Sequence, residues 1–148
     1  MSIDEVTTKD LIQVLEDGKD GFAKAADKLT ESDRPELASV FQQYSQQRAT
    51  FVTELHGLAA TYGDEVKEKG SVAGALHRGW LSVKDTLSGD DPSGVLDAAE
   101  QGEDHAVAAY DKALQQDLSP TLRAVVERQG AAVRAAHDEV RRLRAAQS

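Results

Sequence analysis

The stretch LASVFQQYSQQRATFVTELHGLAATY at residues 37–62 indicates the fold most directly. Its apolar and aromatic residues alternate by steps of three and four, which places them on one face of a long α-helix. These residues are Leu37, Phe41, Tyr44, Phe51, Leu55, Leu58 and Tyr62. One charged residue, Arg48, interrupts this face near its middle. We therefore predict a core-facing helix that carries a polar position at mid-height.

Three further segments repeat this spacing, and each has a glycine or a polar residue near the middle of its apolar face. Gly18 takes that position in the first segment, Glu103 in the third and Gln129 in the fourth. Amphipathic helices of this kind bury their apolar faces against one another. The pattern therefore predicts an all-α four-helix bundle with a polar layer made by Arg48, Glu103 and Gln129, and with room left on the first helix by Gly18 and Gly21.

Capping residues set the expected helix boundaries. Thr7, Asp33 and Ser119 can each accept a hydrogen bond from a free backbone N–H at a helix start. With these starts, one domain at residues 1–148 contains four long helices. They are predicted at about 8–30, 33–62, 93–116 and 119–144.

The segment between the second and third helices is rich in glycine and contains a short amphipathic stretch. We predict a helix at about 71–88 within a long crossover. A helix of about 16 residues spans roughly 24 Å, so with its flanking loops it can return the chain along most of the bundle. The third helix then runs parallel to the second, which is the ferritin-like order of up, down, crossover and a second antiparallel pair.

Composition excludes several classes of function. The chain has 26 acidic and 17 basic residues and a net charge of −9, which argues against a nucleic-acid partner bound through phosphates. It has no cysteine, which rules out thiol chemistry and thiolate metal sites and fits a reducing compartment. No secretory signal pattern and no apolar run of 18 residues occurs. We expect a soluble cytoplasmic protein that is not an integral membrane protein.

Arg48 and Glu103 are expected to pair, because a buried charge without a partner costs several kcal/mol. The crossover topology places the second and third helices diagonally across the core, and Gln129 could satisfy the remaining donors and acceptors. One interpretation is a structural network that fixes helix register. The other is a small pocket for an anion, a small polar ligand or a metal, with Arg48 and Glu103 as its walls. The sequence leaves both interpretations open.

Several segments carry a family resemblance over nearly the whole chain. The segments are FQQYSQQRATFVTEL at 41–55, GSVAGALHRGW at 70–80 and EQGEDHAVAAYDKAL at 100–114, followed by Gln129 and AHDEV at 136–140. Together they resemble a bacterial family of ferritin-like four-helix-bundle proteins of unknown function. The wider superfamily holds a di-iron site with a Glu from each of two helices and a Glu-x-x-His pair from each of the other two.

The sequence departs from that di-iron pattern. The second helix has no Glu-x-x-His, since Glu54 and His56 are only two residues apart and point in different directions. In the fourth helix the residue three before His137 is Arg134. Glu103 resembles a retained superfamily carboxylate. We therefore expect no metal ligands, no cofactor and no ferroxidase or oxygenase chemistry.

These observations lead to a first hypothesis and two alternatives. The first is a non-catalytic ferritin-like bundle that acts by binding or assembly, with the polar layer in place of a di-iron site. The second is a metal-binding protein or an oxidoreductase that uses a non-standard carboxylate site, combining Glu103 with Glu54 or Glu100. The third is a stress-response or scaffold protein that works as a homodimer. The sequence does not identify the ligand or the partner.

Overall fold

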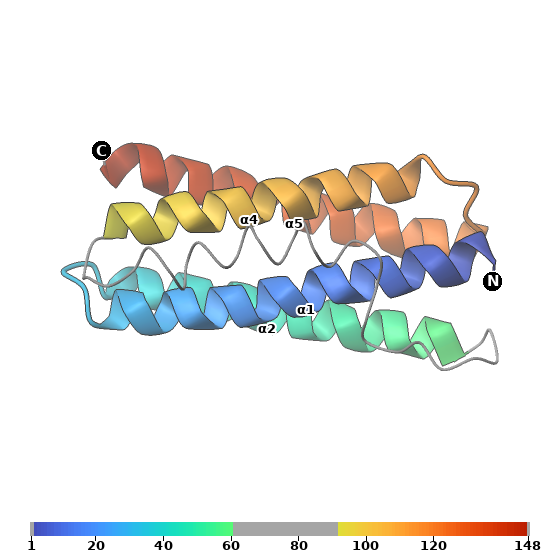
Figure 1. Cartoon of the computed structure of the whole chain (residues 1–148), viewed down its shortest axis with the longest axis horizontal. Coiled ribbons are helices and arrows are strands. Elements are labelled where there is room, and N and C mark those ends of the chain that lie inside the picture. The colour runs from blue at the N-terminus through green and yellow to red at the C-terminus, as the bar shows by residue number, and fades with distance from the viewer. Residues whose placement is uncertain (1, 61–91, 148) are drawn as a thin grey trace.

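The computed structural model describes residues 2–60 and 92–147, and within these ranges the chain forms four α-helices and no strand (Figure 1). The predicted all-α four-helix bundle is confirmed. The predicted crossover helix at 71–88 lies outside the described residues. The helices are α1 (Ile3–Thr30), α2 (Glu36–Ala59), α4 (Pro92–Leu114) and α5 (Pro120–Gln147).

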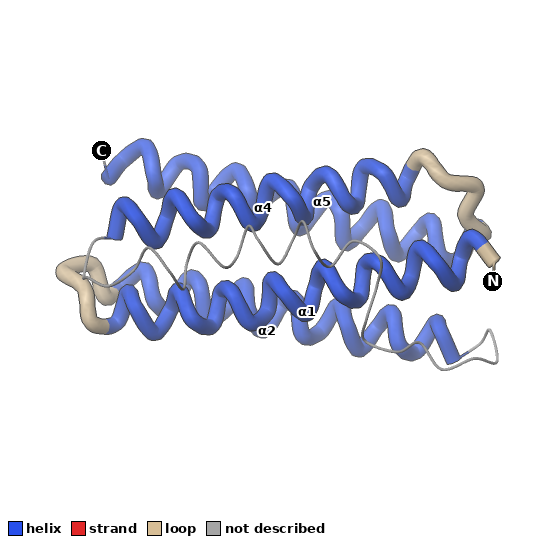
Figure 2. Tube along the Cα trace, in the orientation of Figure 1, coloured by secondary structure: helices blue, strands red, loops and turns tan. Residues whose placement is uncertain are grey.

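The four helices form two antiparallel hairpins, α1 with α2 and α4 with α5, as Figure 2 shows. The two hairpins meet mainly where α1 packs against α4, and α2 and α4 lie diagonally across the bundle. As predicted, α4 runs in the same direction as α2 (Figure 1). Side chains from α2 and α4 can therefore meet only in the centre of the core.

The first helix begins earlier than predicted. Ser2 is its N-cap, and the Ser2 side chain accepts a hydrogen bond from the backbone N–H of Glu5 at 3.1 Å. The expected cap, Thr7, instead lies inside α1 and is buried. The prediction of a start at residue 8 was wrong because Ser2 and the acidic first turn already satisfy and stabilise the positive helix end.

The start of α2 also differs from the prediction. The Ser32 hydroxyl donates to the carbonyl of Leu29 at 2.7 Å and accepts from the backbone N–H of Arg34 at 3.0 Å. Ser32 therefore closes the turn, and Asp33 does not cap the helix, which begins at Glu36. α2 is described as far as Ala59, and the last two predicted positions, 61 and 62, lie outside the described residues.

The second hairpin follows the sequence more closely. Ser119 caps α5 as predicted, with its Oγ accepting from the backbone N–H of Leu122 at 3.4 Å. α5 continues to Gln147, three residues beyond the predicted end. α4 matches its predicted range to within two residues at each end.

The apolar core consists of two clusters. We call the cluster near the α4–α5 loop core A and the cluster near the α1–α2 turn core B. Core A includes Leu11, Leu15, Phe51, Leu55, Tyr110, Leu122, Val126 and Val133. Core B includes Phe22, Leu29, Leu37, Phe41, Leu96, Ala99 and Val140. In α1, α2 and α4 the boundary between the clusters falls at the polar layer predicted from the sequence, at Gly18, Arg48 and Glu103.

Candidate functional site

The centre of the bundle contains an ion pair between Arg48 of α2 and Glu103 of α4. Arg48 Nη1 donates to Glu103 Oε1 and Nη2 donates to Oε2, both at 2.7 Å. Both side chains are 0% exposed. The predicted meeting of these two residues across the diagonal is therefore present, in the two-point geometry that gives a guanidinium and a carboxylate their strongest contact.

The surroundings of Arg48 fix its position. Its guanidinium carbon lies 5.1 Å from the centre of the Phe22 ring, within cation–π distance. Its Nε donates to Gln47 Oε1 at 3.3 Å. A Cβ atom at Gly18 would lie 3.3 Å from Arg48 Nη1, so the missing side chain of Gly18 makes room for the guanidinium as the sequence predicted.

The electrostatics of the site favour a charged arginine. Burial alone lowers the pKa of Arg48, but the neighbouring Glu103 carboxylate outweighs it and raises that pKa above its ordinary value. The pair is thus a neutral unit within the core. Each Glu103 oxygen accepts one hydrogen bond from Arg48, which orients the carboxylate toward α2.

Gln129 belongs to a different group of contacts. Its Oε1 accepts from the Tyr110 hydroxyl at 2.8 Å, and its Nε2 donates to Glu54 Oε1 at 2.8 Å. The expectation that Gln129 completes the Arg48–Glu103 pair was wrong for its hydrogen bonds among the described residues. The reason is the position of Gln129 along the bundle axis. The buried residues before and after it on the same face of α5, Val126 and Val133, both belong to core A.

Glu54 and Tyr110 complete this second group. Glu54, whose side chain is 33% exposed, also accepts a hydrogen bond from Arg128 of α5. Tyr110 is 1% exposed, and burial raises the pKa of its phenol well above the ordinary value. The sequence contained a signal for this residue, because Tyr110 lies two helical turns after Glu103 on the same face of α4.

A third, separate group of contacts joins Glu100 of α4 to two arginines in the C-terminal half of α5. Its two oxygens accept from Arg144 Nη1 at 2.8 Å and from Arg141 Nε at 3.2 Å. Burial raises the pKa of the Glu100 carboxyl, but the two arginines outweigh it and hold that pKa below its ordinary value. The sequence suggested Glu100 as a possible metal ligand, and its spacing gave no sign of these arginine partners.

The three carboxylates considered for a metal site do not converge. Glu103, Glu54 and Glu100 each pair with arginines of their own. Within residues 2–60 and 92–147, no three His, Asp or Glu side chains are arranged as a metal ligand set. His137 likewise takes part in an interhelical contact, with its Nε2 2.5 Å from Asp104 Oδ1.

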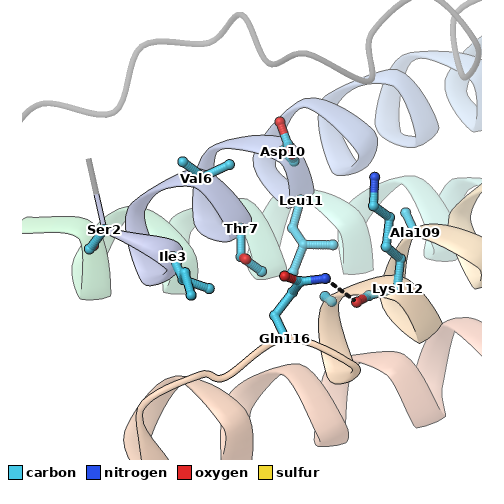
Figure 3. A pocket seen from close by; sticks show the side chains of 10 residues that line it. Ser2, Ile3, Val6, Thr7, Asp10, Leu11, Ala109, Lys112 and Gln116 are labelled. Atoms are coloured by element: carbon cyan, nitrogen blue, oxygen red, sulfur yellow. Dashed lines mark hydrogen bonds between the residues drawn. The ribbon is translucent and has the colours of Figure 1, made fainter.

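A groove of about 370 Å³ lies at one end of the bundle, between the start of α1 and the end of α4 (Figure 3). Its volume is in the range of small-molecule sites. Ile3 and Val6, which are 48% and 40% exposed, contribute part of its aliphatic wall. Asp10 and Lys112 contribute charged side chains to the same groove. None of the polar-layer residues lines it, so the groove and the buried pair are distinct features.

Comparison with known proteins identifies the family. Residues 6–116 match the family model described as "Domain of unknown function (DUF2383)". Because the match covers more than half of the chain, the chain belongs to this family. A search of curated proteins gave no match. In the part of the chain that the structure describes, none of the helices combines the length and apolarity needed to cross a membrane.

Proposed function

We propose that this member of the DUF2383 family is a non-catalytic, ferritin-like bundle that acts by binding or assembly. In this proposal the Arg48–Glu103 pair takes the place that a di-iron site has in related bundles. The support comes from one observation, the fully buried two-point contact between these side chains. This contact bears on two further points, whether the core can bind a metal and where on the bundle a partner can bind.

The buried pair acts against metal binding in two ways. The guanidinium supplies Glu103 with the positive charge that a metal ion would otherwise provide. Both Glu103 oxygens already accept hydrogen bonds, so a metal would have to displace Arg48 and leave its charge buried without a partner. In this proposal the role of the pair is structural. Its two-point contact fixes the register of α2 against α4, as single polar positions do in coiled coils.

A closed core places recognition on the outside of the bundle. Arg48 and Glu103 are both 0% exposed, so a partner that binds the closed bundle meets other residues. The charge of −9 disfavours nucleic acid as that partner. The absence of cysteine is compatible with work in the cytoplasm.

Metal analysis tests the proposal directly. The protein is purified from cells grown in iron-rich medium, and iron per chain is measured for the wild type and for Glu103→Gln. We expect well under one ion per chain in both. A content of about two iron ions per chain, as in di-iron bundles, that is lost in Glu103→Gln would overturn the proposal in favour of a metal-binding protein or oxidoreductase.

Light scattering separates assembly from binding. The chain mass is 15.9 kDa, so a homodimer has twice that mass. A dimer that persists on dilution supports action by assembly. If the measured mass is that of a single chain at all concentrations, action by self-assembly is excluded and binding to another molecule remains.

A further inference from the structure

The four lateral contacts between neighbouring helices are unequal. Within each hairpin the backbones approach closely along the helices, and α1 also approaches α4 at many positions. By contrast, only a few Cα atoms of α2 and α5 come within 8 Å of each other. The contact between the two hairpins is therefore close on the α1–α4 side and wide on the α2–α5 side.

Polar side chains bridge the wide side. The Tyr44 hydroxyl of α2 donates to Glu139 of α5. Further along α2, Glu54 accepts hydrogen bonds from Arg128 and Gln129 of α5. We call these the Tyr44 contact and the Glu54 contact.

Both bridging contacts are partly open to solvent. The side chains of Glu139 and Glu54 are 41% and 33% exposed, and Arg128 is 55% exposed. The exposed Glu54–Arg128 ion pair contributes little to stability, and salt weakens it. The other hydrogen bonds, from Gln129 to Glu54 and from Tyr44 to Glu139, each have one uncharged partner, and Gln129 is buried. Apolar side chains of core A also meet on this side, but the wide spacing of the backbones limits how closely α2 and α5 pack.

The Arg48–Glu103 pair also connects the two hairpins, since Arg48 is in α2 and Glu103 is in α4. Tyr44, Arg48 and Glu54 therefore follow one another along α2, and each holds this helix to the other hairpin through polar atoms. Separation of α2 from α5 admits water to the pair, which lowers the cost of parting the two charges.

We propose that the bundle opens along the α2–α5 side, with the α1–α4 contact as its hinge, and that opening brings Arg48 and Glu103 into contact with solvent. Helices within each hairpin stay packed. This motion is of the hinge type, in which packed units rotate while their internal structure persists. It does not depend on the function proposed above.

Distance measurements between spin labels test this motion, and the lack of native cysteine allows site-specific labelling. One labelled protein carries Thr50→Cys and Ala131→Cys, which reports on α2 and α5. A second carries Asp20→Cys and His105→Cys, which reports on α1 and α4. All four positions are exposed.

The Tyr44 and Glu54 contacts are then removed together by Tyr44→Phe and Glu54→Ala, which leaves the hydrogen bond from Gln129 Nε2 to the Phe51 carbonyl at 3.4 Å in place. We expect the α2–α5 label pair to gain a population at longer distance while the α1–α4 pair keeps its wild-type distribution. The control is Asp111→Ala, which removes an exposed pair with Arg134 between α4 and α5 and should change neither distribution. Equal lengthening of both label pairs, an unchanged α2–α5 distance, or the same response to the control would overturn the proposal.

A salt titration of the otherwise wild-type labelled proteins gives the same comparison if the double variant fails to fold. At about 1 M salt the Debye length is about 3 Å, so the exposed Glu54–Arg128 ion pair is strongly screened. The longer α2–α5 population should grow with salt while the α1–α4 distances stay constant. Insensitivity of both distributions to salt would contradict the proposed opening.

Discussion

Two ion pairs of this bundle use similar groups in opposite surroundings. Arg48 and Glu103 meet at 2.7 Å with both side chains 0% exposed. Arg134 and Asp111 meet at 2.9 Å and 3.0 Å with side chains 55% and 53% exposed. Because the distances are similar, we expect burial to decide how strongly the fold depends on each ion pair.

The physical reason is the hydration of the partner that remains when one member is removed. At the surface, water solvates a lone Asp111 at little cost. In the core, a lone Glu103 has lost its hydration, and Arg48 is the residue that donates hydrogen bonds to both of its oxygens. Glu100, with its side chain 11% exposed, lies between these extremes. Three of the following four measurements test this order, and the Gly18→Ala measurement tests how firmly Arg48 is held. They run from the largest expected effect to the smallest.

Removing Arg48 should have the largest effect. We expect Arg48→Met to lower the free energy of unfolding by about 3–5 kcal/mol, because it leaves Glu103 charged and buried alone. The double variant Arg48→Met with Glu103→Gln should recover most of this loss. Urea denaturation of both variants provides the measurement. Equal stability of the single and double variants would mean that the two residues do not depend on each other.

Filling the space beside Arg48 should have the next largest effect. Gly18→Ala places a Cβ 3.3 Å from Arg48 Nη1, and the guanidinium is held by Glu103 and cannot move away freely. We expect a loss of about 1–2 kcal/mol from overpacking. Gly57→Ala is the matched control, because none of the residues that the structure describes lies within 4 Å of a Cβ placed there, and it should gain up to about 1 kcal/mol. Thermal unfolding of the two variants gives the comparison, and a clear stabilisation by Gly18→Ala would show that Arg48 is loosely held.

Glu100 should give an intermediate effect that depends on pH. Its pKa is lowered in the folded protein, so its contribution is complete above the ordinary glutamate pKa of about 4.3. The contribution is lost as the pH falls through the folded pKa. Glu100→Gln should therefore lower stability by about 1–2 kcal/mol at neutral pH and by progressively less in acid. Denaturation curves over a range of pH measure this, and a constant difference at all pH values would exclude the ion pairs as its source.

The exposed pair should give the smallest effect. Asp111→Ala removes the partner of Arg134, and we expect a change of about 0.2–1 kcal/mol that disappears at high salt. Urea denaturation at low and high salt measures it. A loss of unfolding free energy as large as that of Arg48→Met would contradict the expectation, because exposure would then not affect how much an ion pair contributes to stability.

The sequence predicted the fold well because helix periodicity is a local property. Apolar spacing decides which face of each helix is buried, whatever it packs against. Arg48 and Glu103 were predicted as partners in the same way, since each interrupts an apolar face at mid-height and a buried charge needs a partner of opposite charge. It also predicted the room left at Gly18, which the contact with Arg48 explains.

Other predictions failed because they depend on the heights and reach of side chains in the assembled bundle. Gln129 also interrupts an apolar face, but α5 places it within core A, where Tyr110 and Glu54 are its partners. The start of α1 was predicted at Thr7, but Ser2 is the residue that caps this helix.

By itself, the sequence determined four amphipathic helices, their antiparallel pairing within hairpins and the charged positions inside the core. The tertiary structure alone decided which arginines Glu54 and Glu100 bind, and how closely each pair of helices approaches. These choices depend on relative helix rotation and axial shift, which the spacing of residues along a single helix leaves free.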